Sequence, residues 1–191
     1  MCNDLPLFHL AFFIMKKLVA TLTAILFSLS LSAQVLLEKM RIMDNKLEIL
    51  VPKGFVLVTG QRTSAGSVAS GFKPTWLLSG EDGRVRIGST YGDSVVDDNG
   101  IPGYTDQLIR KVNLEWKKVE MLDDGILLQD GKNIGYIKFY SKDKRQKTFH
   151  YMFYMSLGDR PLLFHVTCDK KQKEKWETVV EQMAASIRLV I

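Results

Sequence analysis

Cysteine and histidine are scarce in this sequence, and their scarcity argues against two classes of protein. The 191 residues include two cysteines, Cys2 and Cys168, and three histidines. A disulfide-stapled fold needs paired cysteines and a structural zinc site needs four converging ligands, so neither is expected. The spacing His165-x-x-Cys168 puts those two side chains on opposite faces of a strand. The fold must therefore be held by apolar burial.

Motifs for common enzyme chemistry are also missing. The chain contains no G-x-S-x-G turn, no P-loop and no dinucleotide-binding glycine pattern. Asp93, Asp97 and Asp98 lack the spacing of a calcium loop and are typical of an acidic turn. A formal net charge of +5 is small for a nucleic-acid-binding protein. We therefore assign no catalytic residue, no cofactor, no metal and no nucleic-acid partner.

The sequence has a second possible start site at Met15. Two lysines follow it, residues 18–31 are apolar and uncharged, and Ser32-Ala33 add small side chains. This is the three-part layout of a secretory signal. A spanning helix needs roughly 20 apolar residues, which is more than this stretch provides. A membrane hairpin that joins residues 5–14 to this stretch is the alternative, but it would put the lysines at its turn.

The signal defines the expected organisation of the chain. Residues 1–33 are predicted to be a leader, with Met15 as the true start and a signal peptide over residues 15–33. Residues 34–191 are predicted to form a single globular domain. The mature protein is expected to be exported, periplasmic or extracellular, with no membrane span after cleavage.

Several segments of the mature chain have clear local signals. Leu47 to Val51 alternates before a proline and a glycine and predicts a first strand, and "RVRIGSTY" predicts another. Helical spacing of apolar residues predicts a helix from about Asp106 to Lys118, capped by Thr105. Asp124-Gly125, between two apolar runs, predicts a hairpin turn.

The strongest tertiary signal lies in "TFHYMFYMSLGDRPLLFHVTCD". Two β-rich runs flank a turn, and placing Leu157 opposite Leu162 pairs Met155 with Phe164 and His165 with Tyr154. Both faces of this hairpin are largely apolar, so it needs cover on both sides. A closing helix that carries an apolar stripe from Trp176, with Asp169 placed as its cap, is predicted to provide part of that cover.

This order of elements resembles the PsbP-like superfamily. The resemblance rests on "LEILVPKGF", the central helix, the antiparallel strands and the closing helix "KEKWETVVEQMAASIRLV". The superfamily includes extrinsic photosystem proteins, Ran-binding proteins of the Mog type and small exported bacterial proteins of unknown function. The resemblance implies an α+β fold in which an antiparallel β-sheet is flanked by helices as an α/β/α sandwich. It brings no shared catalytic residues.

The sequence leaves three functional classes open. The first is an exported non-enzymatic domain that binds a protein or a cell-envelope component. The others are a small hydrolase-type enzyme whose site is not recognisable from sequence, and a carrier of an apolar ligand between sheet and helix. The candidate interaction surface consists of Phe72, Trp76, Tyr154 and His165.

Overall fold

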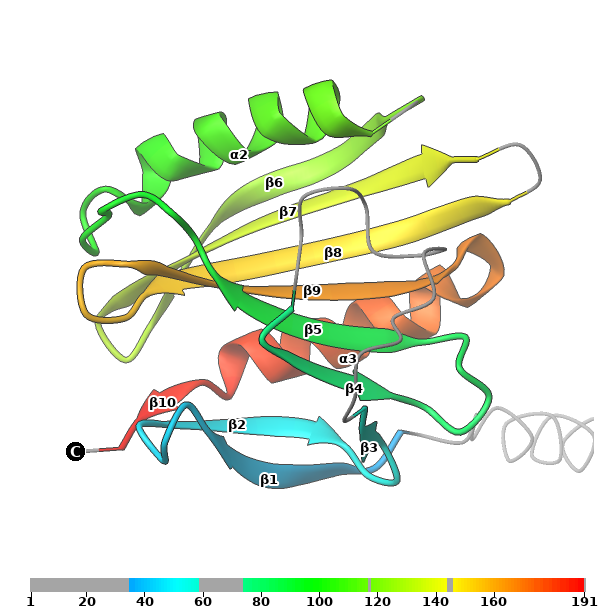
Figure 1. Cartoon of the computed structure of the whole chain (residues 1–191), viewed down its shortest axis with the longest axis horizontal. Helices are drawn as coiled ribbons and strands as arrows, with labels where there is room; N and C mark the ends of the chain where they lie inside the picture. Colours follow the sequence, from blue (N-terminus) through cyan, green and yellow to red (C-terminus); the bar gives the residue numbers. More distant parts are fainter. Residues whose placement is uncertain (1–34, 59–73, 117, 144–145, 191) are drawn as a thin grey trace, which may run out of the picture. The chain divides into compact units, whose positions relative to one another are not determined.

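The structure is a computed structural model that describes residues 35–58, 74–116, 118–143 and 146–190. The predicted leader and the small-residue segment 63–71 lie outside these residues. The described chain consists of two antiparallel sheets and two α-helices (Figure 1). None of its helices is long and apolar enough to cross a membrane.

The larger sheet has seven strands in the order β3-β4-β5-β9-β8-β7-β6. Its strands are β3 (Val56–Leu57), β4 (Trp76–Ser79), β5 (Arg86–Tyr91), β6 (Glu120–Gln129), β7 (Lys132–Lys142), β8 (Lys147–Ser156) and β9 (Pro161–Asp169). The smaller sheet, in the order β1-β2-β10, consists of β1 (Leu37–Ile42), β2 (Leu47–Pro52) and β10 (Arg188–Leu189). The helices are α2 (Ile101–Glu115), the 3-10 turn η1 (Lys170–Gln172) and α3 (Lys173–Ala185).

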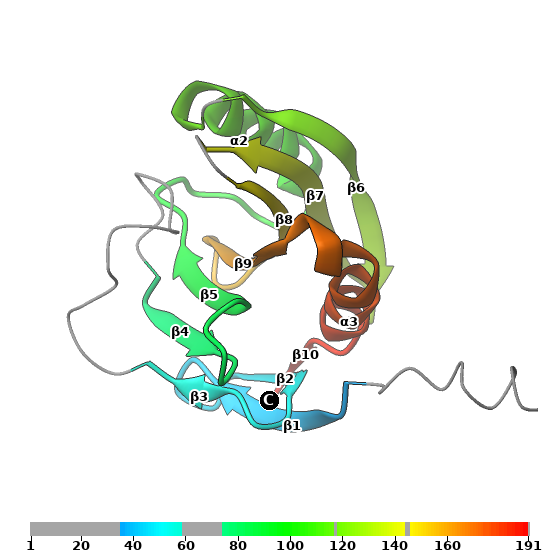
Figure 2. The same ribbon diagram turned by 90° about the vertical axis from the view of Figure 1, so that its right-hand side faces the viewer.

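The two α-helices cover opposite faces of the larger sheet (Figure 2). The helix α2 buries Ile101, Tyr104, Leu108 and Val112 against side chains of β7, β8 and β9. On the other face, α3 packs on β8 and β9 and also on β2 of the smaller sheet. The predicted α/β/α sandwich is confirmed, and the smaller sheet adds to the layer that contains α3.

The central hairpin forms, but its register differs from the prediction. Ser156, not Leu157, is the last residue before the loop and lies opposite Pro161. As a result Met155 faces Leu162, and Phe153 faces Phe164 with the rings stacked. The shift is two residues, so every side chain keeps its predicted face.

The hairpin predicted at Asp124-Gly125 is wrong. Residues 120–129 form one continuous strand, and the chain turns instead at Asp130-Gly131, where φ is positive at both residues (48° and 74°). Both are Asp-Gly pairs, which favour this kind of turn. Gly125 has another role, because a Cβ there would lie 2.8 Å from the Tyr136 hydroxyl oxygen.

Both predicted helices exist with altered starts. The helix α2 begins five residues earlier than expected, because Pro102 suits its first turn, and Thr105 donates a hydrogen bond to Ile101 O instead of capping. The Trp176 stripe of α3 is buried as predicted. Asp169 precedes η1 and makes no side-chain cap.

Candidate functional site

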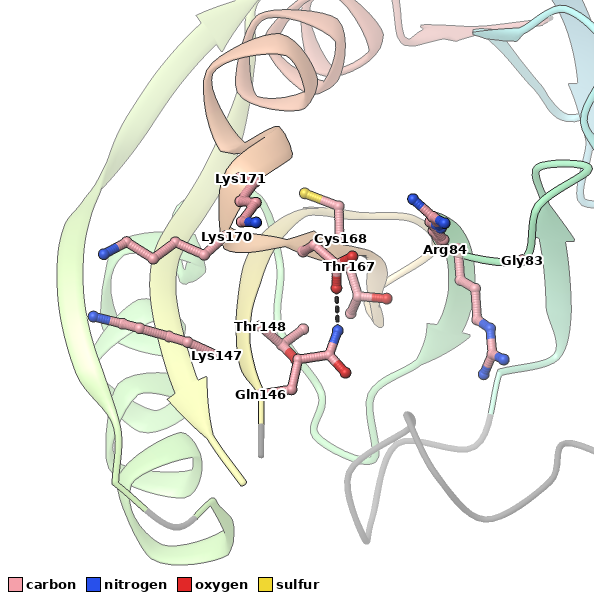
Figure 3. A pocket seen from close by; sticks show the side chains of 11 residues that line it. Gly83, Arg84, Gln146, Lys147, Thr148, Thr167, Cys168, Lys170 and Lys171 are labelled. Carbon is pink, nitrogen blue, oxygen red and sulfur yellow. Dashed lines mark hydrogen bonds between the residues drawn. The ribbon is translucent and has the colours of Figure 1, made fainter. Parts of the chain in front are cut away.

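An open cleft of about 900 Å³ lies at one end of the larger sheet (Figure 3). The start of β5, the start of β8 and the end of β9 with η1 surround it. Its positively charged lining residues are Arg84, Arg86, Lys147, Lys170 and Lys171. Among the described lining residues, one has a carboxylate, Asp169. We call this site the basic cleft.

Strand register explains how distant residues meet in the basic cleft. Arg86 on β5 lies opposite Thr167 on β9, and Thr148 on β8 lies opposite Asp169. Paired residues in antiparallel strands share a face, so Arg86 and Thr167 project from the same side of the sheet. In Figure 3 Lys147 and Lys170 lie on one side, Arg84 on the other, and Gln146 and Thr148 between them.

The cations of the basic cleft outnumber its described carboxylates, and two of them have acidic partners beside the cleft. The Gln146 side-chain amide donates a hydrogen bond to the Asp169 carboxylate. Lys147 pairs with Glu120 and lies 4.2 Å from the centre of the Tyr140 ring. Arg84 pairs with Asp82 at 3.8 Å, but both side chains are more than half exposed, so this pair contributes little. A positive potential is therefore expected over the basic cleft.

This arrangement is suited to binding anions. Arginine guanidinium groups bind carboxylates, phosphates and sulfates in pairs of hydrogen bonds, and lysine ammonium groups add point charges. The hydroxyl groups of Thr148 and Thr167 add neutral donors. Because the cations lie on two sides of a wide opening, an extended or multiply charged anion fits better than a single small ion.

A hydrogen-bonded chain of three side chains crosses β7, β8 and β9. Ser141 Oγ lies 2.7 Å from His150 Nε2, and His150 Nδ1 lies 2.9 Å from His165 Nε2. The His150 ring stacks on Phe139 with 4.5 Å between ring centres, and Trp116 makes a T-shaped contact with it at 6.2 Å. A serine hydroxyl beside a histidine is the arrangement in which the histidine acts as general base for a serine nucleophile. The three side chains therefore bear directly on the hydrolase alternative.

The pKa values of the two histidines argue against catalysis by these three hydrogen-bonded side chains. Burial lowers the pKa of His150 to about 3, and burial together with His150 lowers the pKa of His165 well below its usual value. A general base works best with a pKa near the operating pH. Among the described residues, no carboxylate hydrogen-bonds to His150. The three side chains satisfy one another's buried polar groups, and both imidazoles stay neutral.

Tyr154 and His165, proposed as surface residues, are buried. Tyr154 is fully buried beneath α2, where its hydroxyl donates to Thr105 Oγ1 at 2.7 Å. His165 is 4% exposed. The two do not pair: His165 lies opposite Met152, and Tyr154 lies opposite Leu163. Neither side chain is placed to contact a partner directly.

The structure describes only one of the other two proposed surface residues. Phe72 lies outside the described residues. Trp76 is partly exposed at the start of β4 and lines a hollow of about 470 Å³ beside Tyr91 and the turn at residues 43–46. Trp76 therefore remains a candidate contact residue. Cys168 is buried, and burial raises the pKa of its thiol to about 12.

A further hollow of about 340 Å³ lies between α2 and the larger sheet. Leu108, Val112, Met152 and Leu163 supply apolar surface, and polar side chains such as Lys111 line it as well. This volume is near the lower limit for a small-molecule site. It lies where a carrier of an apolar ligand would need its pocket.

Sequence reasoning missed the basic cleft. Its residues come from three short segments, 83–86, 146–148 and 167–171, each of which reads as a solvated turn or strand end. The signal that was available is the placement of cations at the ends of predicted strands. Using that signal requires knowing that β5, β9 and β8 are neighbours, which the sequence did not provide.

No protein-family model matches the chain, and no curated protein matches it. Solved structures do match. Cyanobacterial PsbP (CyanoP) from Synechocystis sp. PCC 6803 is 9% identical over 84% of this chain and 96% of that chain, with a TM-score of 0.57. LpqN of Mycobacterium tuberculosis, described as involved in cell envelope biogenesis, is 8% identical over 82% and 92%, with a TM-score of 0.50. At such low identity the likeness establishes the fold alone.

Proposed function

We propose that this chain, which has the PsbP-like fold, is an exported non-enzymatic domain that binds an anionic protein or cell-envelope component in the basic cleft. The mature domain is residues 34–191, released from a signal peptide over residues 15–33. The observation that carries the proposal is that cations outnumber carboxylates around a wide opening: its described lining has five cationic side chains, two of them paired with acids beside the cleft, and one carboxylate.

Two further points support this assignment. The Ser141–His150–His165 chain has histidines that resist protonation, which weakens the hydrolase alternative. LpqN, which shares the fold, is described as an envelope biogenesis protein, and the N-terminal segment of this chain has the layout of an export signal. An envelope role is therefore consistent with both the fold and the sequence.

Charge reversal in the basic cleft tests the proposal. The purified protein should bind immobilised polyglutamate or dextran sulfate, and the affinity should fall as salt is added. The variant Lys170→Glu/Lys171→Glu should lose most of this binding, because it replaces two of the five cations with acids. Arg110→Glu is the control, since Arg110 is exposed on α2 and outside the cleft. Equal binding by both variants would contradict the proposal, and preference for one matrix would separate carboxylate from sulfate recognition.

Export has its own test. N-terminal sequencing of the secreted or periplasmic protein should begin at Gln34. Recovery of an intact Met1 in a membrane fraction would overturn the leader prediction without affecting the basic cleft.

The hollow between α2 and the sheet favours a second candidate, a carrier of a small apolar ligand. Native mass spectrometry of freshly purified protein would then show a bound molecule that Val112→Trp expels. If the protein is always recovered without a ligand, the carrier function is contradicted and the basic cleft remains the proposed site.

A further inference from the structure

The free edges of the two sheets are unequally protected. An exposed strand edge invites pairing with another chain, and proteins usually guard it with short strands, charges, prolines or bulges. In the described chain, β3 and β10 have two residues each, and β1 has three charged residues among its six. Within the part of the chain that the structure describes, the ten-residue strand β6 is the terminal strand of the larger sheet and pairs with β7 alone (Figure 2).

The two halves of β6 differ. The first half, residues 120–124, has three acidic residues and a register irregularity between Met121 and Asp123, both of which discourage pairing. The second half, residues 125–129, is uncharged. It contains Ile126, Leu127 and Leu128, which are 38%, 36% and 74% exposed. We call residues 125–129 the open edge.

We propose that the open edge binds the open edge of a second copy of this chain, so that two seven-stranded sheets join through antiparallel β6–β6 pairing centred on Leu127. In this register Leu127 lies opposite its own counterpart, and Ile126 lies opposite Leu128 on both sides of the axis. Gly125 lies opposite Gln129. All exposed apolar side chains of the open edge gain apolar neighbours, and no charged residue enters the paired segment.

The pattern of side chains favours a second copy over an unrelated peptide. Ile126 and Leu128 project from one face of β6 and Leu127 from the other, because side chains alternate along a strand. A two-fold axis perpendicular to the sheet preserves the faces, so each apolar side chain meets its match on the correct side. The acidic first half of each strand then lies beyond the paired segment of its partner. Self-pairing thus keeps charged residues out of the five paired positions, and Asp124 lies next to Asp130 of the second copy at each end of the segment.

The paired segment is short, which bounds the strength of the dimer. Five residues from each copy bury less surface than the roughly 1,200 Å² of a stable interface. A dissociation constant in the micromolar range or weaker is expected, so dimers should appear only at high protein concentration.

Cysteine cross-linking tests the register. In a Cys2→Ser background, Leu127→Cys should form a disulfide-linked dimer under mild oxidation, because opposed Cα atoms in antiparallel strands are about 4.5–5.5 Å apart and within disulfide reach. Gln129→Cys is the matched control, since its sulfur would lie about 13 Å from its counterpart. Cys168 is buried and should not compete. Absence of a Leu127→Cys dimer, or equal cross-linking at both positions, would overturn the proposal.

Sedimentation equilibrium tests the apolar contact. Wild-type protein should show concentration-dependent dimerisation, and Leu128→Lys should weaken it about tenfold or more. Leu114→Lys should leave it unchanged, because Leu114 is 86% exposed on α2 and lies away from the open edge. A wild-type protein that stays monomeric at millimolar concentration, or a dimer that both lysine variants weaken equally, would refute the β6–β6 dimer. The Lys170→Glu/Lys171→Glu variant should still dimerise, so this result is independent of anion binding.

Discussion

The buried histidine pair should make this domain lose stability in mild acid. His150 and His165 are 3% and 4% exposed, and burial lowers the pKa of both below the value of about 6.5 expected in the unfolded chain. Below pH 6.5 the unfolded state therefore binds protons that the native state excludes. Stability falls as pH falls, and the loss continues until the native state also takes up protons, near pH 3 for His150.

The magnitude follows from proton linkage. Each histidine that is protonated only in the unfolded state contributes about 1.4 kcal/mol per pH unit. Because an unfolded histidine is only partly protonated at pH 6, two of them give a slope of about 2.4 kcal/mol per pH unit between pH 6 and pH 5. Against a typical total stability of about 5–15 kcal/mol, this loss would be easy to measure.

Urea denaturation at a series of pH values measures this slope. The variant His150→Gln/His165→Gln removes both titrating groups, so its slope between pH 6 and pH 5 should be smaller by about 2.4 kcal/mol per pH unit, whatever its absolute stability. Glu177→Gln is the control. Burial would raise the Glu177 pKa, but hydrogen bonds from Lys173 and Lys138 lower it, so its contribution is lost only at more acidic pH. Identical slopes for wild type and the histidine variant would refute the reasoning.

The remaining predictions concern packing and a buried charge. Gly135→Ala should destabilise the fold by about 2 kcal/mol, because the new Cβ would lie 2.2 Å from a ring carbon of buried Tyr154. Gly103→Ala should be neutral or slightly stabilising, since nothing lies within 4 Å of its Cβ position, and thermal unfolding of both variants checks the contrast. Lys138→Met should cost about 2 kcal/mol in urea denaturation, because three carboxylates within 4 Å lose their shared cation. A Lys138→Met variant as stable as wild type would show that this cluster contributes little.

Periodicity in the sequence was sufficient to identify the main elements. The apolar stripe from Trp176 and the two-faced run over residues 148–168 predicted a helix packed on a sheet with cover on both sides, and the structure has both. The hairpin register was wrong by two residues because the loop begins and ends one residue earlier than predicted, at Ser156 and Pro161. An even shift leaves every side chain on its predicted face, so the layer arrangement survived the error.

The preference of Asp-Gly pairs for turns could not show which of two such pairs forms the turn. Asp124-Gly125 and Asp130-Gly131 are the same dipeptide, and only the second makes the turn. The glycine at 125 accommodates the Tyr136 ring from the neighbouring strand, a tertiary requirement that the sequence does not display. The β10 strand was missed for a similar reason, because its two residues form a strand only through pairing with β2.

The candidate site was the least predictable feature. Tyr154 and His165 were selected because an apolar strand face with polar groups could line a pocket, but α2 and the neighbouring strands bury both. The basic cleft depends on the adjacency of β5, β9 and β8, which is a property of topology. Charged residues at strand ends become a site only when the strands that carry them are neighbours.

The most direct test of the central claim is to locate an anion on the domain by NMR. Titration of ¹⁵N-labelled protein with a short polyglutamate should shift amide resonances of residues 83–86, 146–148 and 167–171, and the shifts should disappear in high salt. Shifts concentrated around Trp76 or along α2, or no shifts at any concentration, would contradict the assignment of the basic cleft as the binding site.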